Sequence, residues 1–213
     1  MRLLVTAFDP FGGESVNPAL EAVRALPAEV AGAEVVTLQV PTVFGRSIDV
    51  VTAAMDELRP DVVVCVGQAG GRPDVTPERV AINVDDARIG DNEGNQPLDV
   101  PVVDGGPAAY FSSLPVKAMV QAIRDEGLPS SLSNTAGTFV CNHLMYGVLH
   151  HIAARGGGVR AGFVHVPFIP EQVVERPGVA SLALADITRA LQATLAAVVA
   201  HDQDIQLVAG QTH

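Results

Sequence analysis

The segment VVVCV (residues 62–66) is a short run of mostly β-branched residues, which is typical of a strand buried on both faces of a sheet. A pattern at helical spacing precedes it, formed by Ile48, Val51, Met55 and Leu58. Strand-like runs of the same kind occupy residues 3–7, 35–40 and 162–166. Strands that alternate with helices predict an α/β fold, a three-layer α/β/α sandwich around a central mixed, mostly parallel sheet.

Other regions extend this pattern. Apolar residues recur at helical spacing in residues 116–123 and 182–199, which predicts helices there. Residues 80–83 form a short apolar run that we expect to add an antiparallel edge strand. The rest of the long segment 67–115 is crowded with Gly, Pro, Asp and Asn, and irregular chain of that length is costly to order. We therefore expect this segment to carry functional residues.

The length and composition favour one domain. Of the 213 residues 48% are hydrophobic, which is enough for one sizeable core. Because the sequence contains neither a repeat nor a linker, residues 1–213 are expected to form a single domain. The tail at residues 202–213 has no clear pattern and is expected to be loosely held.

The charge balance argues against several partners. The 24 acidic residues outnumber the 13 basic ones, and the net charge of −11 repels nucleic acids and anionic membrane surfaces. Lys117 is the only lysine and lies in no Walker phosphate loop. We expect neither a signal peptide nor a membrane span, and two cysteines are too few for a disulfide framework. These features predict a protein of the reducing cytoplasm.

Cys141 is the first candidate for catalysis. It stands in GTFVCNHL (residues 137–144), directly before apolar residues at helical spacing, so it is expected at the N-terminus of a helix. The unpaired amides there would lower the pKa of the thiol and could also hold an oxyanion. A buried core cysteine is the alternative for Cys141, and it is the expected role of Cys65 within its β-branched strand.

A cysteine nucleophile needs a base, and His165 is the best placed of the six histidines. It lies near the end of a predicted strand, at the sheet edge where α/β proteins build their sites, although a core histidine remains the alternative. His143 is expected to point away from the thiol. His150 and His151 are expected on a solvated helix face, and their spacing does not suit a metal site.

Separated motifs carry a family resemblance. The sequence resembles the pyroglutamyl peptidase I family, the pyrrolidone-carboxylate peptidases, which are cysteine exopeptidases. The motifs are FDPFGG (residues 8–13), GQAGGR with TPERVAIN (67–72 and 76–83), ARIGDNEGNQP (87–97), GTFVCNHL (137–144) and HVPFIPEQ (165–172).

The resemblance implies roles for individual residues. Cys141 would be the nucleophile, His165 its general base and then acid, and Glu78 the carboxylate that orients the imidazole. Arg88 would support the oxyanion, with a loop-ordering ion pair as its alternative role. No metal and no organic cofactor is expected, and the resemblance implies a homotetramer. The residues of the substrate site would be Phe8, Phe11, Asn17, Gln68, Arg88, Phe139 and Val140.

The expected activity is hydrolysis of the N-terminal pyroglutamyl (5-oxoprolyl) residue from peptides through a thioester acyl-enzyme. Two other functions stay open at this point. One is a phosphorolytic transferase of similar fold, which would need phosphate-binding loops. The other is a noncatalytic protein that binds pyroglutamyl peptides without cleaving them.

Overall fold

The predicted strands form the middle of a six-stranded sheet in the computed structural model, which describes residues 1–210. The sheet has the order β2–β3–β1–β4–β8–β5, and its four central strands run parallel. These strands are β3 (Ala33–Val40), β1 (Arg2–Phe8), β4 (Val62–Gln68) and β8 (Arg160–Val166). Every residue of β4 is buried, as the β-branched run 62–66 predicts.

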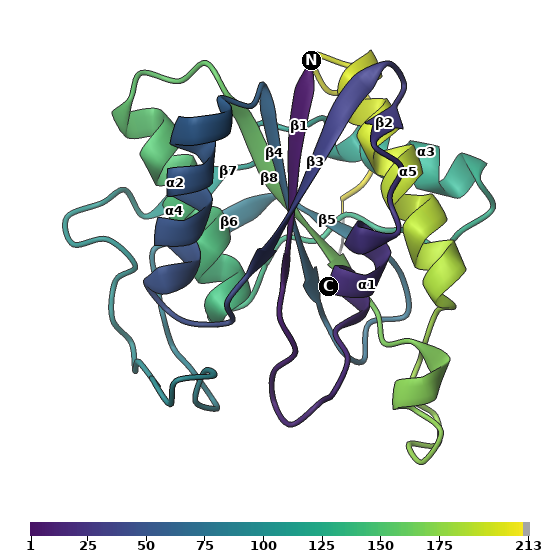
Figure 1. Cartoon of the computed structure of the whole chain (residues 1–213), viewed down its shortest axis with the longest axis horizontal. Helices are drawn as coiled ribbons and strands as arrows, with labels where there is room; N and C mark the ends of the chain where they lie inside the picture. Colours follow the sequence, from purple (N-terminus) through teal and green to yellow (C-terminus); the bar gives the residue numbers. More distant parts are fainter. Residues whose placement is uncertain (211–213) are drawn as a thin grey trace.

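Helices cover both faces of the sheet, so the predicted three-layer sandwich is confirmed (Figure 1). The helices α1 (Pro18–Arg24), α3 (Val116–Asp125) and α5 (Leu184–Ala200) pack on one face. The helices α2 (Arg46–Leu58) and α4 (Val140–Ala154) pack on the other. Alternation along β1 supplies both cores, because Leu3 faces the first group and Leu4 the second. The predicted helices correspond to α2, α3, α4 and α5.

The antiparallel edge of the sheet is not where the sequence places it. The run at residues 80–83 becomes β6 (Val80–Ile82), which pairs with β7 (Ala109–Phe111) in a separate two-stranded sheet. The edge strand is instead β5 (Thr76–Glu78), antiparallel to β8, and β2 (Glu29–Val30) borders the other side. Pro77 makes β5 hard to predict, but an edge strand tolerates its missing N–H.

The segment that follows α5 contacts the body of the protein. Asp204 accepts hydrogen bonds from the backbone N–H groups of Lys117 and Ala118, so it supplies the first turn of α3 with a partner. This contact concerns the described part of the tail, and residues 211–213, with His213, lie outside the described residues. Within residues 1–210 no helix is long and apolar enough to cross a membrane.

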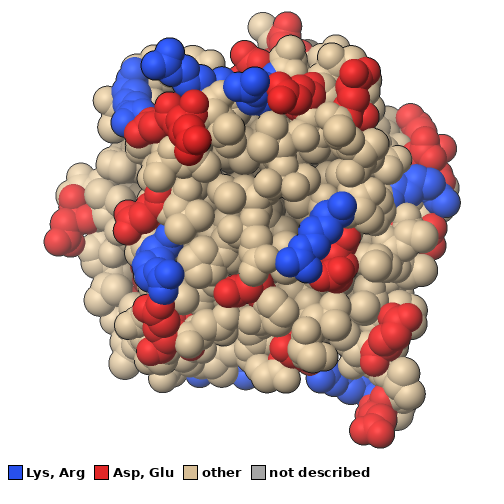
Figure 2. Space-filling view, in the orientation of Figure 1, with Lys and Arg blue, Asp and Glu red and all other residues tan. Residues whose placement is uncertain are grey.

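Acidic and basic side chains are mixed on the surface. On the face shown in Figure 2, most basic side chains lie beside acidic ones. Arg155 pairs with Asp56, and Arg46 with Glu93. This mixing fits the expectation that phosphate backbones are not the main partner.

Candidate active site

The site forms at the edge where the parallel strands end, the lower edge of the sheet in Figure 1. β8 carries His165 next to its last residue, and β5 ends in Glu78. Cys141 is the second residue of α4, so its predicted place at a helix N-terminus is confirmed. In the sheet register Gly67 lies opposite His165, and a Cβ at Gly67 would come 3.0 Å from Cys141 Sγ. The thiol therefore lies above β4, beside the strand that carries the imidazole.

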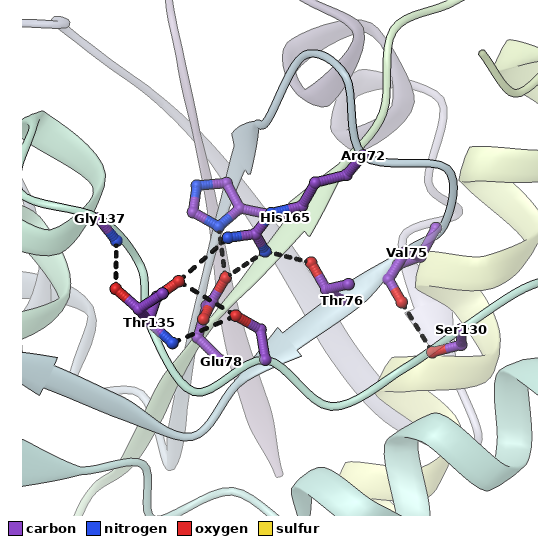
Figure 3. A network of polar contacts seen from close by, with 9 residues as sticks. Arg72, Val75, Thr76, Glu78, Ser130, Thr135, Gly137 and His165 are labelled. Atoms are coloured by element: carbon purple, nitrogen blue, oxygen red, sulfur yellow. Dashed lines mark hydrogen bonds and ion pairs between the residues drawn. The ribbon is translucent and has the colours of Figure 1, made fainter. Parts of the chain in front are cut away.

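Glu78 is the centre of a buried polar network (Figure 3). His165 Nδ1 lies 2.7 Å from Glu78 Oε1, and Arg72 Nη1 donates to the same oxygen at 2.6 Å. Arg72 also donates to Thr76 Oγ1 at 2.6 Å and to the carbonyl oxygen of Thr135 at 3.0 Å. Since Nδ1 carries the proton toward the carboxylate, Nε2 of His165 is left as the acceptor.

Arg72 is the member of this network that sequence reasoning missed. It belongs to GQAGGR, directly after β4, and its partners lie on β5 and in the loop before α4. The only sequence signal was its position in a glycine-rich turn at the end of a strand, where α/β proteins place functional groups.

The surroundings of His165 and Glu78 set the charges of these two side chains. Burial lowers the pKa of His165 below its ordinary value, although the hydrogen bond to Glu78 acts in the opposite direction. Burial acts to raise the pKa of Glu78, but the hydrogen bond and charge of His165, together with the charge of Arg72, bring it below its ordinary value. At neutral pH Glu78 is thus an anion that Arg72 balances, and His165 is a neutral base.

The expectation of a lowered pKa for Cys141 is wrong. Burial, followed by the negative charge of Glu78, raises the pKa of this thiol to about 12. The charge of Arg72 and the backbone N–H of Cys141 act to lower this pKa but do not offset burial and the charge of Glu78. With the pKa of the thiol raised and that of the imidazole lowered, both side chains are neutral near pH 7.

The start of α4 offers donors to an anion. The first hydrogen bond of the helix runs from His143 N–H to the carbonyl oxygen of Phe139 at 3.1 Å. The N–H groups of Val140, Cys141 and Asn142 precede it and so have no partner in the helix ladder. These amides stand next to the thiol, where an acyl-transfer intermediate would carry its negative charge.

A pocket of about 350 Å³ opens over Cys141 and His165. The rings of Phe11 and Phe139 lie 6.2 Å apart in its wall, and Gln68 contributes a polar group. Arg88 lines the pocket as well and is in none of the salt bridges found within residues 1–210. The remaining lining residues are Ala69, Arg72, Asp86, Ile89, Thr135, Ala136, Gly137 and Thr138.

Three of the predicted substrate-site residues lie outside this lining. Phe8 is buried in the core against Phe163, with ring centroids 6.3 Å apart. Asn17 caps α1 by accepting from the N–H of Ala19 at 3.0 Å. Val140 is fully buried beneath the start of α4.

The other histidines of α4 have structural partners. Neither ring nitrogen of His143 faces the thiol, as predicted, because Nδ1 pairs with Asp85 and Nε2 accepts from Gly45 N–H. His150 stacks on Tyr146 and is hydrogen-bonded to Tyr110 at 3.0 Å, so the predicted solvated face is wrong for it. The two-stranded sheet of β6 and β7 covers this side of α4. Among residues 1–210, no three His, Cys, Asp or Glu side chains gather as metal ligands.

A cysteine at a helix start, a buried imidazole and the carboxylate that holds it, on an α/β sheet, define a cysteine hydrolase. The model of the family described as pyroglutamyl peptidase matches residues 1–202, and the chain belongs to this family.

Named relatives agree with this assignment. The chain is 56% identical over 210 residues to a pyrrolidone-carboxylate peptidase of Clostridium perfringens, covering 99% of both chains. It is 57% identical to one of Streptococcus pneumoniae over 214 residues and the full length of both. The solved pyroglutamyl peptidase I of Bacillus amyloliquefaciens has a TM-score of 0.94 at 50% identity, covering 97% of this chain and 98% of that one. A mutant pyrrolidone carboxyl peptidase of Pyrococcus furiosus has a TM-score of 0.90 at 38% identity, covering 94% and 99%.

Proposed function

We propose that the chain is a cysteine peptidase that removes the N-terminal pyroglutamyl residue from peptides, with Cys141, His165 and Glu78 as its catalytic residues. The observation that carries the proposal is the 2.7 Å contact of Glu78 with His165 in the pocket that Cys141 lines. Family membership supplies the substrate class. A phosphorolytic transferase and a noncatalytic binding protein have no support in the comparisons.

In the first half of the reaction, Cys141 Sγ attacks the carbonyl carbon of the pyroglutamyl residue while His165 Nε2 takes the thiol proton. The carbonyl oxygen becomes an oxyanion, which the free amides at the start of α4 and the side chain of Arg88 stabilise. The C–N bond then breaks, and His165 returns the proton to the leaving amine. The products are a pyroglutamyl thioester on Cys141 and the shortened peptide.

In the second half, water replaces the amine. His165 takes a proton from the water as it attacks the thioester. The C–S bond then breaks, and His165 returns the proton to the sulfur, which releases pyroglutamate and restores the thiol and the neutral imidazole. Glu78 stays ionised throughout. It keeps the proton of the neutral ring on Nδ1 and stabilises the imidazolium that forms in each half.

The pocket suits a small neutral lactam. The rings of Phe11 and Phe139 would contact the edges of the five-membered ring, and Gln68 would form hydrogen bonds with its polar groups. Proline has the ring without the lactam carbonyl. A site that hydrogen-bonds this carbonyl would disfavour proline by about 1–3 kcal/mol for each partner left unpaired.

The test is turnover of a fluorogenic pyroglutamyl amide under reducing conditions in phosphate-free buffer, beside the matching prolyl amide. We expect cleavage of the first substrate only, no effect of added phosphate, and loss of activity in Cys141→Ala. Turnover that survives Cys141→Ala would show that Cys141 is not the nucleophile. Turnover that requires phosphate would favour the phosphorolytic transferase as the function.

We further propose that residues 1–213 form one peptidase domain that assembles as a homotetramer in the cytoplasm. The tetramer rests on the family resemblance, and exposed apolar side chains such as Phe111 and Val174 are available for contacts between subunits. The cytoplasm suits a nucleophile that must stay a reduced thiol. Sedimentation velocity tests the assembly, and a monomer at micromolar concentration would contradict it.

A further inference from the structure

A second buried imidazole–carboxylate pair includes His143, which lies two residues after Cys141 in α4. His143 Nδ1 is 2.7 Å from Asp85 Oδ2, and both side chains are more than nine-tenths buried. The reaction proposed above uses neither of them. Apolar side chains can often replace a buried ion pair without loss of stability, so stability alone does not explain this pair. The other contacts of His143 and Asp85 indicate its role.

The remaining ring nitrogen of His143 holds a loop. Its Nε2 accepts a hydrogen bond from Gly45 N–H at 2.8 Å, directly after Phe44. An imidazole that donates through Nδ1 and accepts through Nε2 is neutral, and Asp85 selects this tautomer. His143 thus ties the start of α2 to α4, across a separation of 98 residues in sequence.

The loop that His143 holds supports the wall of the pocket. The ring of Phe44 packs edge-on against His143, with centroids 5.2 Å apart, and edge-on against Phe139, at 5.4 Å. Phe139 in turn packs against Phe11 at 6.2 Å, and these two rings line the pocket. A continuous row of rings therefore connects His143 to the surface that would grip the lactam.

The residue that follows Asp85 is hydrogen-bonded to the same wall. Asp86 donates its N–H to the carbonyl oxygen of Thr138 at 2.9 Å, and Thr138 precedes Phe139 in the chain. The His143–Asp85 pair therefore joins α4, the loop at Phe44 and Gly45, and the segment at Asp85 and Asp86, beside the pocket that Cys141 lines. The Glu78–His165 pair stands on β5 and β8.

We propose that His143 is a positioning residue for substrate binding, which sets Phe44 behind Phe139 and so fixes the aromatic wall for the pyroglutamyl ring. The inference rests on the proposed function. It predicts that loss of the Gly45 contact weakens binding of the lactam while the chemistry at Cys141 continues.

Two substitutions separate the contacts of His143. In His143→Asn the side-chain amide nitrogen replaces Nδ1 and keeps the bond to Asp85, but nothing reaches Gly45. In His143→Gln the longer side chain places an oxygen near the position of Nε2 and keeps the acceptor for Gly45. His150→Asn is the matched control, because His150 lies on the same helix and contacts Tyr110 and Tyr146 away from the pocket.

The readouts are KM and kcat for the pyroglutamyl amide, and protection of Cys141 from alkylation by a small five-membered lactam. We expect KM and the lactam concentration for half protection to rise about tenfold in His143→Asn, the loss of one hydrogen bond, with kcat little changed. We expect values close to wild type in His143→Gln and His150→Asn. A KM within about twofold of wild type in His143→Asn, or equal losses in His143→Asn and His143→Gln, overturns the inference.

Phe44→Leu provides a second route that does not depend on the stability of the His143 variants. We expect it to raise KM by about tenfold as well, and the double variant with His143→Asn to be no worse than the poorer single variant, because both act on one contact. Fully additive effects, or an unchanged KM in Phe44→Leu, overturn the role of the ring. If the wild-type protein does not cleave the pyroglutamyl amide, the proposed function itself is wrong. This outcome is distinct from a failure of the inference, which compares variants with an active wild type.

Discussion

The thiol of Cys141 lies against the bare face of Gly67, so closely that a Cβ on this glycine would come 3.0 Å from Sγ. The same Cβ would come 2.8 Å from Cζ of Phe163, which blocks an outward shift on that side. Glycine is required here for space and not for its backbone angles. The position of this thiol therefore depends on Gly67 of β4.

Gly67→Ala is expected to displace the thiol and lower kcat by about 100-fold, the usual cost of a misplacement of about 1 Å at a reacting atom. Steady-state kinetics with the pyroglutamyl amide measures the loss. Gly210→Ala is the matched control, since a Cβ there meets nothing within 4 Å. Full activity in Gly67→Ala would show that Cys141 does not occupy this place during catalysis.

Arg72→Gln is expected to shift the acid limb of the pH profile of kcat/KM to higher pH. The charge of Arg72 lowers the pKa of His165, so its removal raises that pKa and keeps the imidazole protonated up to a higher pH. The kcat/KM of Arg72→Gln should recover at pH values above this shifted limb. Arg189→Gln on α5 is a control, because Arg189 pairs at the surface with Asp186 and Glu126. A limb that stays in place would contradict this role for Arg72.

The free energy of unfolding is expected to fall as the pH decreases below about 6.5, the ordinary pKa of histidine in the unfolded chain. The native pKa of His165 is depressed by burial, so the unfolded state binds this proton first and gains stability relative to the folded state. The depressed pKa of Glu78 adds a second loss at more acid pH.

Urea unfolding across this pH range measures the effect. His165→Asn keeps a donor to Glu78 without a titrating ring, so its stability should depend less on pH between about 6.5 and 5. Cys141→Ala retains both groups and should follow the wild type. Equal slopes in wild type and His165→Asn would mean that His165 is not buried as a neutral base.

Alkylation by iodoacetamide is expected to label Cys141 and to spare Cys65 in the native protein. Burial raises the pKa of both thiols to about 12, so the difference arises from access and from the base. Cys65 is 1% exposed within β4, whereas Cys141 lines the pocket with His165. His165→Asn should slow the labelling of Cys141, which mass spectrometry of peptides would follow. Equal labelling of both thiols would contradict the assignment.

Local patterns predict most of the fold. The β-branched run at residues 62–66 and the helical spacing after Cys141 both report directly on burial, so β4 and α4 follow from them. β5 does not, because three residues around Pro77 carry no periodic pattern, and their pairing with β8 is a contact across 87 residues of chain. The contact of His150 with Tyr110 could not be predicted for the same reason, because it forms only in the tertiary fold.

The proposed catalytic residues differ in how far the sequence reveals them. Cys141 and His165 can be proposed from their places at a helix start and a strand end. Glu78 cannot be selected from 24 acidic residues without the family motif, because its partner lies far away in sequence. The direction of the pKa shift of Cys141 required the structure, since helix position alone omits burial and the charge of Glu78, which raise the pKa.

The neutral resting thiol has a consequence for life under oxidative stress. Peroxides attack the thiolate form of cysteine, and a thiol that stays protonated reacts with them slowly. Because the raised pKa keeps most of the resting Cys141 protonated, we expect peroxide to oxidise it more slowly than a cysteine whose pKa is low. The raised pKa that slows oxidation of this thiol is also the reason that its proposed attack on the substrate needs His165 as a base.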